Sequence, residues 1–237
     1  MLQSFDFGAE APRRAFGRFD AGLGDGGQAV VVLPDGAAAV ALTEDGGGGM
    51  QWFQSPDCRG GRDAAAAPGW LIAAPPLLDL WRERVVRLRI APRPDACPAA
   101  FDASLTRWRL ARIAMPWREA RTGGRGGAAE VDTLLSEHFG GAARAAADHL
   151  ERFWFARDLG LVRWERWEDP ARTRLPDLAR RAAVLAGSGR CPEVAFSEPP
   201  APGWAMADCR TWTNFDRAGP PGSPPLAALP WPAPALR

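Results

Sequence analysis

The chain has 237 residues, of which 46% are hydrophobic and 24% charged, which is enough for one large domain or two small ones with a buried core. Its 28 acidic residues nearly cancel its 29 basic ones, so the net charge creates no strong field toward nucleic acid or an anionic membrane, and nucleic-acid binding is not expected. No stretch approaches the roughly 18 apolar residues of a transmembrane helix, so no membrane span is expected.

The N-terminal part of the sequence predicts an antiparallel β structure. From Gln28, the run QAVVVLPDGAAAVALTEDGGGGMQWFQ alternates β-branched and apolar stretches with two turn signals, which predicts three strands. Residues 70–74 and 84–90 continue the pattern, and the second of these alternates an apolar face with an arginine-bearing one. Residues 104–117 fit either a strand or a short helix, and we interpret them as a strand because Pro116 suits a meander.

A glycine-rich segment, RTGGRGGA at residues 121–128, is the clearest internal linker, because four glycines within six positions hold no fixed backbone cheaply. It divides a domain at 1–120 from a second portion at 129–216. The Pro-rich tail at 217–237 is expected to be disordered.

The second portion predicts strands and helices in mixture. VDTLLSEHF at 131–139 fits a strand, and the Ala-rich run GAARAAADHLER at 141–152 fits a brief helix. Residues 175–186 predict a second helix with Leu178, Ala182 and Leu185 on its buried stripe. Strands are expected again at 194–197 and 204–215.

The segment FWFARDLGLVRWERWE, residues 153–168, combines five aromatic rings with six charged side chains. Its aromatic and β-branched enrichment favours a hairpin that turns at 158–160, although an Ala-rich helix ending at Gly160 is an alternative. The rings could form a ladder that fills a core.

A ligand-binding face is the sharper interpretation of the same segment. Trp164 or Trp167 would stand on a solvated face beside Arg163, Glu165 and Arg166. A sugar ring suits this combination, because its apolar C–H face meets an indole and its hydroxyl rim meets charged groups.

Four cysteines occur without a C-x-x-C pair, so the spacing lacks the usual zinc or redox signature. We expect two disulfides, Cys58 with Cys97 and Cys191 with Cys209, because each pair closes a loop within one half of the chain. Disulfides favour an oxidising compartment, so we expect a periplasmic or secreted protein. The first residues, MLQSFDFGAEAPRRAF, show no signal peptide as given, and a cytoplasmic protein with free thiols is the alternative.

Other candidate chemistry is weaker. Glu137, His138, Asp148 and His149 could assemble a metal or acid-base site, but their spacing is not that of a zincin helix, and no metal or cofactor is expected. Acidic pairs for glycoside hydrolysis exist at Glu44 with Asp45 and at Glu165 with Glu168. Sequence does not show the separation that this chemistry requires.

The runs FDFG, TEDGGGG, PDCRG, SEHFGG, DHLERFWFARDLGLVRWERW and DCRTWTN together resemble an uncharacterised family of exported proteins from GC-rich bacteria. The resemblance covers about residues 4–215. The segment WFARDLGLVRWE is also similar to a strand-turn-strand near the end of some bacterial lipoproteins. These resemblances imply an envelope or secreted location and transfer no catalytic residue.

These observations predict a mostly β protein with some α: an N-terminal antiparallel β-sandwich or jelly-roll-like module followed by a smaller α+β portion. The eleven tryptophans, the β pattern and the expected disulfides favour a non-catalytic, extracytoplasmic module that binds saccharide or a cell-envelope component. A glycan-active hydrolase or lyase that uses Glu and Asp is one alternative. A structural envelope or protein-interaction module is another.

Overall fold

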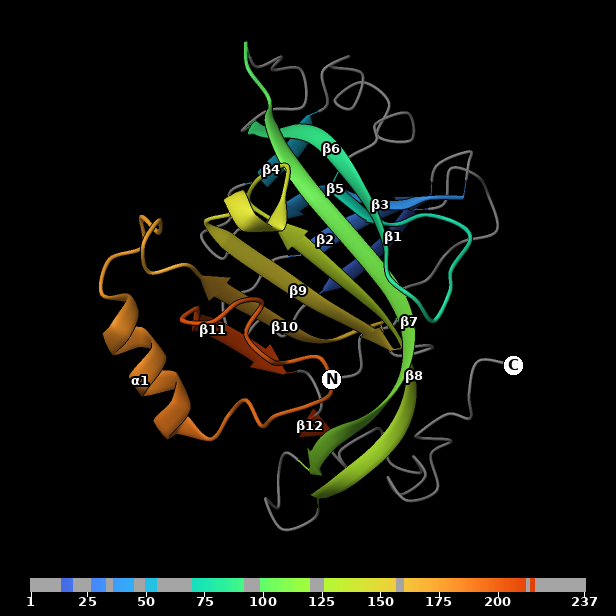
Figure 1. Ribbon diagram of the computed structural model, residues 1–237. Coiled ribbons are helices and arrows are strands. Elements are labelled where there is room, and N and C mark those ends of the chain that lie inside the picture. The colour runs from blue at the N-terminus through green and yellow to red at the C-terminus, as the bar shows by residue number, and fades with distance from the viewer. Residues whose placement is uncertain are drawn as a thin grey trace. The chain divides into compact units, whose positions relative to one another are not determined.

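The protein is mostly β with a single α-helix among the described residues, which confirms the predicted class (Figure 1). The computed structural model describes residues 14–18, 27–32, 36–44, 50–54, 70–91, 99–119, 126–156, 160–211 and 214–215. No helix within these residues has the length and apolar character needed to cross a membrane.

The strands follow the chain in a simple order. Their bounds are β1 Arg14–Arg18, β2 Gly27–Val32, β3 Ala38–Glu44, β4 Met50–Gln54, β5 Trp70–Ala73, β6 Arg82–Ala91, β7 Asp102–Glu119, β8 Gly126–Phe139, β9 His149–Ala156, β10 Gly160–Glu168, β11 Ala205–Thr211 and β12 Asn214–Phe215. The helix α1 covers Leu178–Ser188, and a short 3-10 helix covers Arg144–Ala146.

The chain forms two compact units, which we call the N-terminal unit (residues 3–109 and 136–147) and the C-terminal unit (residues 1–2, 110–135 and 148–237). The chain passes from one unit to the other within β7, within β8 and again between Ala147 and Asp148. β8 begins at Gly126, inside the segment that the sequence marks as a linker.

The N-terminal unit contains an antiparallel sheet in which the order β1-β2-β3-β4-β6-β7 is nearly that of the sequence, with β5 paired to β3. This order is that of a meander, and it differs from the Greek-key order of a jelly roll. The predicted strands near residues 28–54, 70–74 and 84–90 are confirmed, because β2 to β6 cover these positions. The strand interpretation of 104–117 is also confirmed, because β7 covers it.

The C-terminal unit contains the predicted hairpin. β9 and β10 pair antiparallel, with Trp164 opposite Phe153 and Trp167 opposite Leu150, and β11 pairs with the other edge of β10. The buried side chains of Leu150, Phe153 and Trp154 belong to its core. The aromatic ladder therefore contributes to packing, and Trp154 is wholly enclosed.

The helix α1 lies beside β11 in the C-terminal unit (Figure 1). Leu178 and Leu185, seven residues apart, are its buried positions, as the predicted stripe requires. The helix ends at Ser188 and is capped by Gly189, whose φ of 63° lies in the left-handed region that glycine adopts without strain. The predicted helix is confirmed, shifted toward the C-terminus by two or three residues.

Two expected elements are wrong. The Ala-rich run at 141–152 is not an α-helix, because only Arg144–Ala146 form a 3-10 turn and β9 begins at His149. Pairing of β9 with β10 outweighs the helical propensity of a few alanines. Residues 194–197 form a turn rather than a strand, closed by a hydrogen bond from the Ser197 amide to the Val194 carbonyl.

Candidate functional site

Strand β10 divides the predicted ligand-binding residues between its two faces, because successive side chains of a strand point to opposite sides. Arg163, Glu165 and Trp167 are all buried, whereas Trp164 and Arg166 are half-buried. Trp167 is only 6% exposed and does not stand on a solvated face. The structure thus brings three of the five predicted residues together and separates the other two from them.

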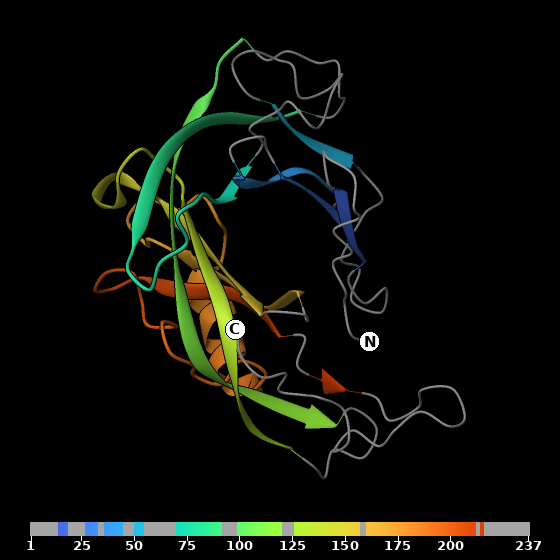
Figure 2. The same cartoon turned by 90° about the vertical axis from the view of Figure 1, so that its right-hand side faces the viewer.

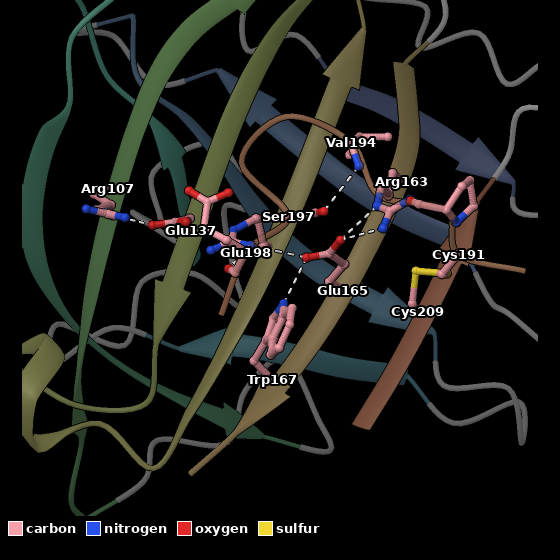
Figure 3. Close-up of polar contacts among 12 residues, drawn as sticks. Arg107, Glu137, Arg163, Glu165, Trp167, Cys191, Val194, Ser197, Glu198 and Cys209 are labelled. Atoms are coloured by element: carbon pink, nitrogen blue, oxygen red, sulfur yellow. Dashed lines mark hydrogen bonds and ion pairs between the residues drawn. A yellow bond between two sulfur atoms is a disulfide. The ribbon is translucent and has the colours of Figure 1, made fainter. Parts of the chain in front are cut away.

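A buried ionic cluster forms around Glu165 (Figure 3). One carboxylate oxygen, Oε1, accepts a hydrogen bond of 2.8 Å from Nε of Arg163, whose Nη2 lies 2.7 Å from the same atom. The other, Oε2, accepts from Nη1 of Arg152 at 3.2 Å and from Nε1 of Trp167 at 2.8 Å. Four N–H groups therefore surround one carboxylate whose side chain is 0% exposed.

Two opposing effects act on the pKa of Glu165. Burial raises the pKa above its ordinary value, because it penalises the charged carboxylate. The guanidiniums of Arg163 and Arg152, together with the indole N–H of Trp167, act in the opposite direction. Burial is the larger effect, so the pKa of Glu165 is raised overall and its partners only reduce the shift.

The same two arginines hold the segment at residues 190–199, which we call the α1–β11 segment. Nη1 of Arg163 donates to the Pro192 carbonyl at 2.8 Å, and Nη1 of Arg152 donates to the Glu198 carbonyl at 3.1 Å. Figure 3 shows Val194 and Ser197 of this segment beside the cluster, joined by a 3.2 Å hydrogen bond from the Val194 amide to Ser197 Oγ.

A disulfide between Cys191 and Cys209 fixes the beginning of the α1–β11 segment to β11, with Cα atoms 6.2 Å apart. This predicted pairing is confirmed. The other predicted pair, Cys58 with Cys97, lies outside the described residues. The α1–β11 segment is thus attached covalently at Cys191 and by buried guanidiniums at both Pro192 and Glu198.

A pocket of about 530 Å³ opens between α1, the α1–β11 segment and the strands beneath them. Its volume lies within the range typical of small-molecule sites. The lining is mainly apolar with a few polar groups: Arg163, Trp167, Ala182, Leu185, Ala186, Gly189, Cys191, Glu193, Val194, Ser197, Glu198, Pro199 and Met206. All of these residues belong to the C-terminal unit.

The opposite face of β10 carries a half-buried network around Glu151. Trp164 donates from its indole N–H to Glu151 at 3.0 Å, and Nη1 of Arg166 lies 3.4 Å from the same carboxylate. The guanidinium carbon of Arg210 lies 5.2 Å from the centre of the Trp164 ring. Both predicted residues on this face are therefore engaged within the sheet, and neither lines the pocket.

The residues considered for a metal or acid-base site have separate partners. Glu137 forms an ion pair with Arg107, and Nε2 of His138 lies 2.8 Å from Oγ of Ser136. His149 contacts Asp148 at 2.6 Å. Within the described ranges, no group of three or more His, Cys, Asp or Glu residues is arranged to hold a metal ion.

The acidic pairs considered for glycoside hydrolysis also have other roles or lie elsewhere. Glu168 accepts from Nε of Arg166 at 2.6 Å and from Thr173 at 2.7 Å, while Glu165 is saturated by its own donors. Asp45 lies outside the described residues.

Sequence reasoning missed Arg152 and the pocket-lining residues of the α1–β11 segment. The one available signal is the alternation of Arg163, Glu165 and Trp167 at every second position, which places opposite charges on one strand face. Arg152 completes this cluster because the register of the hairpin places it opposite Glu165, and the hairpin pattern alone does not set that register.

Comparison of the chain with protein-family models, with curated proteins and with solved structures finds no match.

Proposed function

We propose that the protein is a non-catalytic, extracytoplasmic binding module whose ligand occupies the pocket beneath α1. The observation that carries the proposal is this pocket of about 530 Å³, whose floor is fixed by the ionic cluster and whose wall is fixed by the disulfide. Such anchoring supports a preformed site, because a rigid wall lowers the ordering cost of binding.

A saccharide from the cell envelope is the ligand class that we propose. The pocket combines the side chains of Leu185 and Met206 and the small exposed part of Trp167 with the acidic residues Glu193 and Glu198. Apolar surface suits the C–H face of a sugar ring, and carboxylates accept hydrogen bonds from its hydroxyls. The Cys191–Cys209 disulfide supports a location in an oxidising compartment.

The state of the polar groups supports binding rather than catalysis. Glu165 already accepts from three side chains, so it has no free position for a substrate proton. Among the residues that line the pocket, all of them in the described part of the chain, no histidine stands beside Ser197 to activate its hydroxyl.

A saccharide array followed by calorimetry tests the proposal. Ala186 and Ala183 are both exposed on α1, but only Ala186 lines the pocket. Ala186→Trp would fill the pocket and is expected to weaken saccharide binding at least about tenfold, whereas Ala183→Trp should leave it unchanged. Equal affinities of the two variants, or no binding to any saccharide of the array, would refute the proposal.

A glycan-active hydrolase remains the second candidate, because Glu193 and Glu198 both line the pocket. Release of labelled oligosaccharide by the wild-type protein would favour catalysis. Loss of that release in Glu193→Gln or Glu198→Gln would assign the chemistry to these carboxylates.

A further inference from the structure

The connection between β5 and β6, which we call the PPLLDLW loop after its residues 75–81, presents apolar side chains to solvent. Leu77 is 44% exposed and Leu80 is 53% exposed. Pro75 and Pro76 are exposed as well, and Trp81 is half-buried. Single exposed hydrophobics are ordinary, but a run of them marks a site of interaction.

Exposed apolar groups concentrate in this stretch of the chain. Five large hydrophobic side chains are exposed in the described residues, namely Leu77, Leu80, Val85, Ile90 and Val184. Four of these lie between positions 77 and 90, in the PPLLDLW loop and in the strand that directly follows it. Only Val184 lies elsewhere, on α1.

The protein holds the PPLLDLW loop in place at both ends. The indole N–H of the buried Trp108 donates to the Ala74 carbonyl at 3.0 Å. Arg109 donates to the Asp79 carbonyl, and its guanidinium carbon lies 5.7 Å from the centre of the Trp81 ring. The guanidinium carbon of Arg107 lies closer to that ring centre, at 4.1 Å. The leucines thus project from an anchored loop.

Charge identifies the partner of this surface. The near-zero charge of the whole chain conceals a local excess, because residues 75–91 carry four arginines against two acidic residues, Asp79 and Glu83. One of these arginines, Arg89, lies 3.8 Å from Asp102, so the excess is concentrated at the start of β6. This strand, drawn in teal in Figure 2, begins directly after Trp81. Leucines and tryptophan beside arginines match the boundary of an anionic bilayer, where apolar groups enter the acyl region and guanidiniums bind phosphates.

We propose that the PPLLDLW loop and the arginines of β6 dock the protein onto an anionic lipid surface. The bilayer accepts Leu77, Leu80 and the exposed part of Trp81, while Arg82 and Arg84, both exposed, meet the headgroups. This surface belongs to the N-terminal unit and shares no residue with the pocket. Docking therefore goes beyond the proposed ligand binding.

Sedimentation with large vesicles tests the docking surface. The wild-type protein is expected to pellet with phosphatidylglycerol–phosphatidylcholine vesicles and to stay in solution with phosphatidylcholine alone. The Leu77→Ser/Leu80→Ser variant should bind about tenfold or more weakly, because less apolar area enters the bilayer. Val184→Ser is the matched control, since Val184 is 60% exposed on α1, and it should bind as the wild type does.

The arginines have their own test. Arg82→Gln/Arg84→Gln should weaken binding to the anionic vesicles and reduce its dependence on salt. A wild-type protein that stays in solution with anionic vesicles would overturn the proposal, as would equal binding by the leucine variant. Concentration-dependent self-association that the leucine variant abolishes would overturn it too, because the surface would then bind a second copy of the chain. None of these three results affects the pocket proposal, which the Ala186 variant tests separately.

Discussion

Removal of the charge on Glu165 tests the physical basis of the candidate site. Glu165→Gln keeps the shape of the side chain but replaces one carboxylate oxygen with an amide NH2 group. That group would face guanidinium or indole donors where the carboxylate now accepts hydrogen bonds from Arg152, Arg163 and Trp167. The variant would leave both guanidiniums, which are 2% and 0% exposed, without this counter-ion.

The expected loss of stability follows from this burial. Removal of one partner from a buried ion pair costs about 3 to 5 kcal/mol, because the remaining charge stays desolvated. The unfolding free energy from denaturant titration, with the Cys191–Cys209 disulfide kept oxidised, is the measurement. Glu130→Gln is a suitable control, because Glu130 is 55% exposed in its 3.8 Å pair with Arg112, and such pairs contribute about 0 to 1 kcal/mol. A loss below about 1 kcal/mol in Glu165→Gln would refute the inference that the cluster holds the site together.

Three further predictions follow from described contacts. Cys191→Ser/Cys209→Ser should lower the unfolding free energy by about 3 kcal/mol, since the bridge spans 18 residues. If the denaturant midpoint of the wild-type protein is the same with and without reductant, this prediction is wrong. Burial lowers the pKa of His138 from 6.5 to about 3. As the pH falls below 6.5, the unfolded chain therefore binds a proton at this histidine before the folded chain does. The unfolding free energy should fall by up to about 1.4 kcal/mol per pH unit between these two values. Subtraction of the pH profile of His138→Asn from that of the wild type isolates this slope, and identical slopes would exclude it. Leu185 is 8% exposed on α1, so Leu185→Ala should lower the thermal midpoint and the unfolding free energy, the latter by about 2 to 4 kcal/mol. An unchanged midpoint would show that the Leu185 side chain does not contribute to the packing of α1.

The hairpin and the helix were predictable because short-range patterns determine them. β-branched and aromatic residues on either side of 158–160 favour two strands, and the apolar stripe from Leu178 to Leu185 fits one helix face. The helix prediction for the run at 141–152 is wrong because the local preference of alanine competes with sheet pairing that begins at His149. Propensity describes a residue alone, whereas β9 is stabilised by its neighbour β10.

The candidate site was predictable only in part. Three of the five residues chosen from the sequence do share one face of β10, but charged side chains were expected to face water. Arg163 is enclosed because a carboxylate two positions away and a carbonyl from Pro192 compensate its charge. The second of these partners comes from a segment 29 residues distant, and no periodicity in the sequence reports it.

The bond between Cys191 and Cys209 also affects how the protein responds to proteolysis. Exposed residues lie between the two cysteines, among them Glu193, Ala195 and Gly203, so this interval offers accessible peptide bonds. A single cut there would produce two fragments that remain covalently joined. The nicked protein would migrate as one chain on a gel without reductant and would separate into two only after reduction.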